Sequence, residues 1–195
     1  MTASAKPAAA TINVPNILTL IRILLTPLFV LSITWHLMGY ALFVFAMAAA
    51  TDALDGLLAR WLNQRTPIGA YLDPLADKLL STAAFVSLSM VGIIPVWLAV
   101  IVISRDLLIL MGIAVLKLTD VPFEMAPSAI SKGTTLVQML TICLALLAGD
   151  AAFLVFIYAA TAVMTIVSGL QYIYRGMNLL QSAPEDSGRD DYDHP

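Results

Sequence analysis

The sequence predicts an all-α, polytopic membrane protein with six transmembrane helices. Hydrophobic residues make up 60% of its 195 residues, charged residues only 12%, and its mean hydropathy is +0.90. Soluble domains average about 45–50% apolar and about 25% charged residues. A water-soluble globule of this length has no interior large enough for so many apolar side chains, and such a composition also excludes disorder for the body of the chain.

The arrangement of the apolar residues supports the same fold class, because they form six stretches that could each cross about 30 Å of hydrocarbon as a helix. These stretches cover residues 17–37, 40–61, 71–91, 94–116, 130–147 and 151–174. Short turns, for example at Gly92 and at Gly149-Asp150, are expected to join them into helical hairpins. We therefore divide the chain into a polar N-terminal segment (1–13), a membrane domain (14–176) and an acidic tail (177–195) that we expect to be disordered.

The individual stretches carry further signals. The first is too long for the apolar region of a signal peptide and contains Arg22, so we expect it to remain as a span. Eight residues, 61–68, turn the chain between the second and third stretches, and Pro67 favours the restart of a helix there. The single cysteine, Cys143, lies within the fifth stretch and excludes an intrachain disulfide.

The distribution of basic residues predicts the orientation. The turns after the first, third and fifth stretches contain no Lys or Arg, whereas the N-terminus, the other turns and the C-terminus do. The positive-inside rule then places both termini in the cytoplasm. We expect an integral protein of the cytoplasmic (inner) membrane, in contact with the lipid bilayer. With a net charge of −3 and no basic patch, nucleic acid is not an expected partner.

Four carboxylates lie where a membrane helix rarely carries charge. Asp52 and Asp55 come late in the second stretch, and Asp73 and Asp77 come early in the third. Each would cost about 2.5–3.5 kcal/mol at a bilayer centre. Because the second stretch runs toward the cytoplasm and the third leaves it, we expect all four near the cytoplasmic ends of two adjacent antiparallel helices.

The spacing of these residues predicts two facing acidic surfaces. One helix face carries positions i, i+3, i+4 and i+7, and the next carries i, i+4 and i+8: Asp52, Asp55, Gly56 and Ala59, then Gly69, Asp73 and Asp77. Carboxylates so close together repel, and a pair of divalent cations would relieve the repulsion. Oxygen-only ligands favour Mg²⁺ or Mn²⁺, and two such ions about 3.5–4 Å apart promote displacement at phosphorus. The small residues alone are also explained by close helix packing.

The segment DALDGLLARWLNQRTPIGAYLDPLAD fits the pattern D-x-x-D-G-x-x-A-R, eight residues, then G-x-x-x-D-x-x-x-D. This pattern resembles the signature of the CDP-alcohol phosphotransferases (CDP-alcohol phosphatidyltransferase class I), and the resemblance extends over about residues 13–175. A chance match of eight positions at one place has a probability of about 10⁻⁸ by composition.

The resemblance implies a role for each signature position. Asp52, Asp55 and Asp73 would hold two Mg²⁺ or Mn²⁺ ions, with Asp77 as a further ligand and as general base. Room for the cytidine nucleotide would come from Gly56, Ala59 and Gly69, and Arg60 would steady the nucleotide or its phosphates. An acceptor hydroxyl would then attack the lipid-side phosphorus of CDP-diacylglycerol and release CMP, at a site facing the cytoplasm. The family resemblance also implies a homodimer.

The acceptor is predicted from other segments. NVPNILTLIRILLTP, LDPLADKLL and ISRD resemble the phosphatidylglycerophosphate synthases and the eukaryotic-type cardiolipin synthases. Arg105 and Lys132 are candidates to bind an acceptor phosphate, although Arg105 alone is also explained by neutralisation of Asp106.

One departure separates the two acceptors. Thr134 stands where phosphatidylglycerophosphate synthases usually have a second lysine in K-x-K-T. Fewer cations suit the single charge of a phosphodiester, so we favour phosphatidylglycerol as acceptor, giving cardiolipin, over glycerol 3-phosphate. On this interpretation, Thr134→Lys would shift preference toward glycerol 3-phosphate.

Two other classes of protein also contain acidic residues in a helical bundle. A divalent-cation transporter is the main alternative, since intramembrane acids also mark ion paths. Against it, the four acids cluster toward one face of the membrane instead of following a route across it. A catalytically inactive assembly partner is the second alternative, and the complete acidic set argues against it.

Overall fold

The computed structural model describes the backbone of residues 14–61, 69–118, 129–149 and 151–182, and the side chains of 17–52, 76–112, 129–149 and 151–178. Within these ranges the secondary structure is entirely helical, which confirms the all-α prediction. The helices are α1 (Val14–Thr34), α2 (Met38–Trp61), α3 (Gly69–Met90), α4 (Val96–Leu118), α5 (Ala129–Ala148) and α6 (Leu154–Ser182). Each predicted stretch corresponds to one helix, and α6 continues through the first six positions of the predicted tail.

Membrane-spanning character is clearest in three of the helices. Ile17–Thr34 of α1, Ala129–Ala148 of α5 and Leu154–Asn178 of α6 are long and apolar enough to cross a bilayer. The described apolar part of α2, Met38–Asp52, is shorter. The six-span topology and the side of the membrane on which the termini lie therefore stay predictions.

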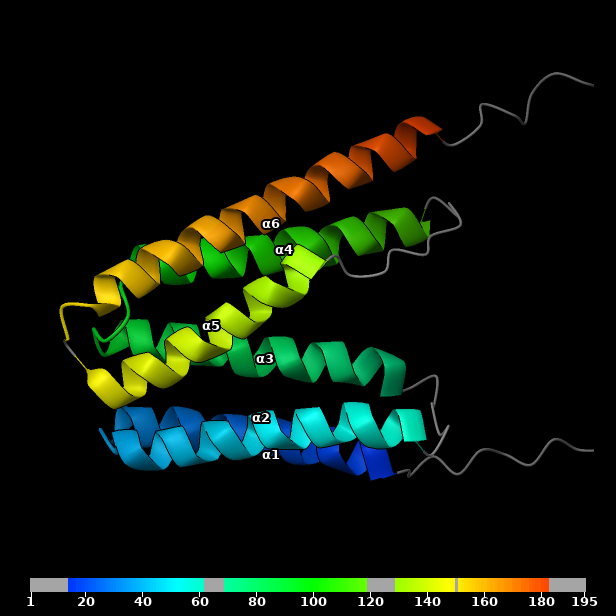
Figure 1. The fold of residues 1–195 in the computed structure, drawn as a ribbon. Helices are drawn as coiled ribbons and strands as arrows, with labels where there is room; N and C mark the ends of the chain where they lie inside the picture. The colour runs from blue at the N-terminus through cyan, green and yellow to red at the C-terminus, as the bar shows by residue number, and fades with distance from the viewer. Residues whose placement is uncertain (1–13, 62–68, 119–128, 150, 183–195) are drawn as a thin grey trace, which may run out of the picture.

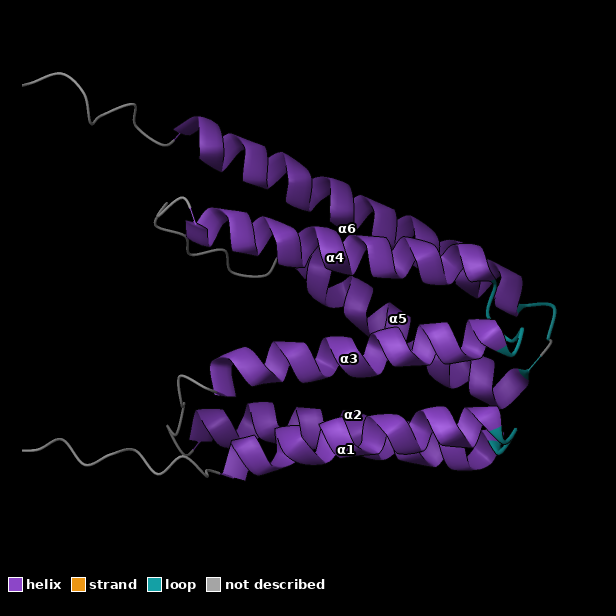
Figure 2. Ribbon diagram, turned by 180° about the vertical axis from the view of Figure 1, so that it is seen from behind, coloured by secondary structure: helices purple, strands orange, loops and turns teal. Residues whose placement is uncertain are grey.

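The helices alternate in direction, so that α1, α3 and α5 begin at the end of the bundle where α2, α4 and α6 finish (Figure 1). Helix α1 packs against both α2 and α3, whereas α6 packs against α4 and α5. Helix α3 also contacts α4, and α5 crosses obliquely to reach α2 and α3. From behind, α1 lies in front of α2 and α5 lies behind α3 (Figure 2). The end of α2 and the start of α3 are thus at the same end of the bundle, and both contact α1.

The α1–α2, α3–α4 and α5–α6 turns lie at the opposite end. Each contains a residue with positive φ: His36 (57°), Gly92 (79°) and Gly149 (55°). After α3, the amide of Ile93 donates to the carbonyl of Leu88, as in a Schellman motif. The left-handed residue ends each helix while its last carbonyls stay hydrogen-bonded. The predicted turns at Gly92 and Gly149 are confirmed, and Asp150 lies outside the described residues.

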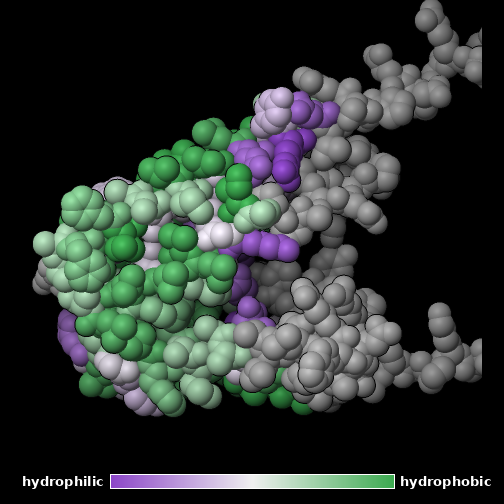
Figure 3. Space-filling view, in the orientation of Figure 1, coloured by the Kyte–Doolittle hydropathy of each residue, from purple (hydrophilic) through white to green (hydrophobic). Residues whose placement is uncertain are grey.

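The apolar core lies toward this turn-bearing end and in the centre of the bundle. Phe29 of α1 and Phe45 of α2 are fully buried, with ring centroids 5.7 Å apart. Buried Ala41 and Ala48 on α2 allow close helix approach, which drives helix association in lipid more than hydrophobic burial does. The described surface is apolar over most of this end, whereas hydrophilic residues gather at the other end beside a hollow (Figure 3).

Candidate active site

The structure places the eight signature residues on the two predicted helices. The end of α2 and the start of α3 carry them in order: Asp52, Asp55, Gly56, Ala59 and Arg60, then Gly69, Asp73 and Asp77. The side chains of Asp52 and Asp77 are described. The side chains of the other six lie outside the described residues, so their predicted roles stay predictions.

The two described aspartates lie inside the bundle rather than at the helix tips. Asp52 is nine positions before the end of α2 at Trp61, and Asp77 is eight positions after the start of α3 at Gly69. At 1.5 Å per residue, this distance is about 12–14 Å along each helix. The helices therefore extend well past the acids.

Asp52 is paired with an arginine from a third helix. The Nη2 atom of Arg22 on α1 lies 2.7 Å from the Oδ1 atom of Asp52, and the two side chains are 1% and 42% exposed. The contact is an ion pair without hydrogen-bond alignment, and the Nε and Nη1 atoms of Arg22 have no hydrogen-bond partner among the described residues. Both Arg22 and Asp52 also lie within electrostatic range of Asp77. The structure therefore brings Asp52 and Asp77 near a common buried cation.

Among the described residues, the two acid-bearing helices pack mainly on a third helix, and the predicted facing of their acidic surfaces stays a prediction. The extensive contacts of α2 and α3 are with α1, and α5 touches both. Helix α1 therefore packs against both acid-bearing helices, and its Arg22 is paired with Asp52 of α2.

A second charge cluster joins α3 and α4. The Oδ1 atom of Asp106 accepts hydrogen bonds from Lys78 Nζ at 3.0 Å and from Arg105 Nη1 at 2.8 Å. The Nη2 atom of Arg105 donates to Ser131 Oγ on α5 at 2.7 Å and to Ser168 Oγ on α6 at 2.8 Å. This cluster therefore links four helices, α3 and α4 through the carboxylate of Asp106 and α5 and α6 through the guanidinium of Arg105.

These contacts bear on the predicted acceptor site. Arg105 is 4% exposed, and both of its terminal nitrogens are engaged by protein groups. The interpretation in which Arg105 neutralises Asp106 is therefore observed directly, whereas phosphate binding by Arg105 stays a prediction. Lys132 on α5 is exposed and has no ion pair among the described residues.

Thr134 belongs to the packing between α5 and α6. Its side chain is fully buried, and its hydroxyl donates to the carbonyl of Ile130 at 2.9 Å, with the carbonyl of Met164 at 3.3 Å. Similar polar contacts continue along the interface, where Gln138 Nε2 donates to Thr165 Oγ1 at 3.1 Å. A lysine at position 134 would place its ammonium inside this interface, so the charge argument drawn from this position loses its geometric basis.

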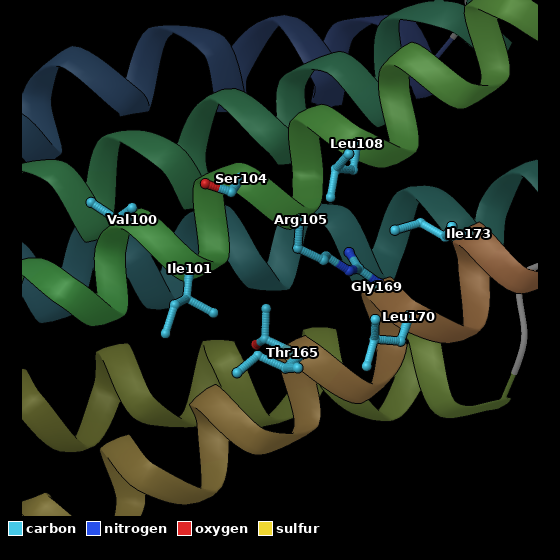
Figure 4. A pocket seen from close by; sticks show the side chains of 10 residues that line it. Val100, Ile101, Ser104, Arg105, Leu108, Thr165, Gly169, Leu170 and Ile173 are labelled. Atoms are coloured by element: carbon cyan, nitrogen blue, oxygen red, sulfur yellow. The ribbon is translucent and has the colours of Figure 1, made fainter.

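An apolar groove of about 270 Å³ lies between α4 and α6 (Figure 4). Its walls are mainly aliphatic, with Val100 and Ile101 on one side and Leu170 and Ile173 on the other. The stem of Arg105 lines it, but the guanidinium is engaged as described above. The groove therefore offers little to a polar nucleotide, and the candidate centre remains the end of the bundle that carries Asp52 and Asp77.

Two of the four predicted metal ligands, Asp52 and Asp77, have described side chains. Among the described side chains, no group of three or more His, Cys, Asp or Glu residues is placed to hold a metal ion. Asp55 and Asp73 are outside that range. The donor chemistry fits a hard divalent ion, because Asp52 keeps a half-exposed carboxylate that interacts electrostatically with the carboxylate of Asp77.

Sequence reasoning did not assign a role to Arg22, or to Lys78 beside Asp106. An arginine in the middle of an apolar stretch was the available signal, because intramembrane charges pair and mark functional sites. Its partner was not readable from spacing, since Arg22 and Asp52 come from different helices.

Comparison with known proteins decides the family. The profile of the CDP-alcohol phosphatidyltransferase family matches residues 12–168. The chain belongs to the CDP-alcohol phosphatidyltransferase family. The resemblance drawn from the acidic signature is thereby confirmed.

Relatives in this family carry two names. The human protein named cardiolipin synthase (CMP-forming) is 34% identical over 190 residues, which covers 87% of this chain and 63% of the relative. A probable phosphatidylglycerophosphate synthase of Mycobacterium tuberculosis is 34% identical over 177 residues, covering 85% and 82%. The CDP-diacylglycerol–glycerol-3-phosphate 3-phosphatidyltransferase of Bacillus subtilis is 33% identical over 194 residues, covering 88% and 98%. The chain thus spans less than two thirds of the human relative, and the names divide between two acceptors.

Proposed function

We propose that this protein transfers the phosphatidyl group of CDP-diacylglycerol to a hydroxyl of a glycerol-type acceptor and releases CMP, in phosphatidylglycerol or cardiolipin synthesis. One observation carries the proposal: all eight signature positions lie at one end of α2 and α3 in a chain that belongs to the family. The half-exposed carboxylate of Asp52, which interacts electrostatically with Asp77, supports a polar reaction centre at that end.

The chain's own residues suit a displacement at phosphorus. Asp77 takes the proton from the acceptor hydroxyl, whose oxygen forms a bond to the lipid-side phosphorus while the bond from that phosphorus to the bridging oxygen breaks. The bonding electrons leave with CMP. Asp52, Asp55, Asp73 and Asp77 would hold two Mg²⁺ or Mn²⁺ ions, which when bound neutralise the diphosphate and stabilise the leaving group. Gly56, Ala59 and Gly69 would leave room for the cytidine, with Arg60 beside its phosphates.

Phosphatidylglycerol is the acceptor that we favour, giving cardiolipin, and glycerol 3-phosphate is the second candidate. The fixed contacts of Arg105 leave Lys132 as the described candidate for an acceptor phosphate, which supports an acceptor of low charge. The matched relatives include a protein named for each reaction, so their names are compatible with either acceptor.

The setting belongs to the same proposal. We place the protein in the cytoplasmic (inner) membrane as a homodimer with six spans, both termini and the reaction centre facing the cytoplasm. Helix α1 begins and helix α6 ends at the same end of the bundle, which supports placement of both termini on one side of the membrane (Figure 1). The basic residues of the N-terminus, even-numbered turns and C-terminus support the cytoplasmic side.

An acceptor panel tests this function. Purified full-length protein in detergent is given CDP-diacylglycerol and Mg²⁺ with phosphatidylglycerol, glycerol 3-phosphate, inositol phosphate or serine, and the products are resolved by mass. We expect CMP release with cardiolipin as the main product, and loss of both on addition of EDTA. Phosphatidylglycerophosphate as the main product would select the second acceptor. Absence of CMP with every acceptor, together with Mg²⁺ flux into liposomes, would replace the transferase with a transporter.

A further inference from the structure

Arg22 is a buried cation whose described ion-pair partner belongs to the proposed metal site. Its side chain is 1% exposed and contacts Asp52 at 2.7 Å. Burial of an unpaired charge in a membrane helix is costly, so such residues are kept beside partners or functional sites. The ion pair with Asp52 accounts for its burial, but it also takes part of the charge of a carboxylate that a metal ion would use.

Two other cations in the bundle differ in this respect. Lys78 and Arg105 both donate to Asp106, which is not a signature residue. Arg105 is further held by two serine hydroxyls. No such group among the described residues hydrogen-bonds to Arg22. Arg22 also interacts electrostatically with Asp77. Arg22 is therefore the described cation that forms an ion pair with a signature aspartate, whereas Lys78 also acts electrostatically on Asp77.

Charge counting shows what this cation does to a loaded site. The four signature carboxylates carry four negative charges, and two divalent ions carry four positive charges. On the proposed ligand set, the ions would thus balance the carboxylates, and Arg22 would add one positive charge to the loaded cluster. The diphosphate of a CDP-linked lipid is anionic, so a net positive cluster binds it better than a neutral one.

We infer that Arg22 is a positioning residue that lowers the affinity of the acidic cluster for divalent ions alone and raises its affinity for the CDP diphosphate. This inference rests on the proposed function. Arg22 holds Asp52 in place through one oxygen while it repels the ions, so ions and nucleotide load together. Charge interactions at a few ångströms exceed 1.4 kcal/mol at the effective dielectric of a protein, and 1.4 kcal/mol corresponds to a tenfold change.

The test measures two affinities by calorimetry on the purified full-length protein in detergent. Mn²⁺ is titrated without nucleotide, and cytidine diphosphate is then titrated at saturating Mn²⁺. For Arg22→Met we expect Mn²⁺ to bind about tenfold more tightly and cytidine diphosphate about tenfold more weakly than in the wild type. Arg22→Lys keeps the charge and should stay near the wild-type values. The opposite signs are diagnostic, because a merely structural role would weaken both ligands.

Two further variants complete the design. Arg175→Met removes an exposed arginine on α6 that has no predicted binding role, and we expect both affinities to remain unchanged. Arg22→Gln is a second neutral variant in case Arg22→Met does not fold. Unchanged or weakened Mn²⁺ binding in the neutral Arg22 variants would overturn the inference. Failure of both to fold even with Mn²⁺ would overturn it too, because it would assign Arg22 to folding. Absence of Mn²⁺-dependent nucleotide binding in the wild type would instead overturn the proposed function.

Discussion

The bundle contains two buried arginine–aspartate pairs in very different settings. Asp52 beside Arg22 is 42% exposed and lies on the α1–α3 side, whereas Asp106 beside Arg105 is 5% exposed and lies among α3 to α6. Asp106 receives two cations, and Arg105 is also held by two hydroxyls. The Arg105–Asp106 pair is thus buried, and most of its polar atoms are hydrogen-bonded. The Arg22–Asp52 pair instead leaves its carboxylate half-exposed. The comparison teaches that partners and exposure, rather than residue type, separate a structural charge from a candidate for ligand binding.

The largest expected effect is on the Asp52 site. Asp77→Asn removes the proposed base while it keeps the shape of the side chain, so we expect transfer to fall by about 10²–10⁴-fold. The rate of CMP release measures this loss, and the melting temperature of the variant should stay near that of the wild type. Near-normal turnover would show that Asp77 is not the general base. It would also weaken the proposed difference between the Asp52 and Asp106 sites.

The Asp106 site is expected to respond in stability instead. Asp106→Asn leaves Lys78 and Arg105 without their shared carboxylate, and loss of one partner from a buried pair costs about 3–5 kcal/mol. Thermal unfolding in detergent measures the loss. As a matched comparison, Asp52→Asn should destabilise less and raise the Mg²⁺ concentration needed for half-maximal activity. A larger change in Mg²⁺ requirement for Asp106→Asn than for Asp52→Asn would reverse the assignment of the two pairs.

The smallest expected change in catalytic activity follows from a substitution in the α5–α6 interface. Thr134→Lys introduces a charge at a fully buried position, and an uncompensated buried polar group costs about 1–3 kcal/mol or more. We expect a lower melting temperature and an unchanged ratio of phosphatidylglycerol to glycerol 3-phosphate use. Thr134→Ser, which keeps the hydroxyl bonded to the carbonyl of Ile130, is the control. A marked shift toward glycerol 3-phosphate would restore the view that this position sets acceptor charge.

The sequence was most informative where the pattern is local. Helix spans follow from runs of apolar residues, and the turns at Gly92 and Gly149 follow from the backbone freedom of glycine. The acidic signature also lies within one hairpin, so its family was readable from spacing alone. The interpretation of Thr134 shows the limit, because spacing along a helix does not tell which neighbour covers each face.

By itself, therefore, the sequence determined the helical membrane fold, the family and the positions of the four aspartates, since these depend on composition and short-range order. Only the tertiary structure decided that Arg22 of α1 pairs with Asp52 of α2, and that Arg105 is held by Asp106, Ser131 and Ser168. Such pairings join residues that are far apart in the chain, and the packing of α1 on α2 and α3, and of α6 on α4 and α5, brings them together. The physical reason is that a charge inside a membrane bundle takes its partner from whichever helix lies beside it.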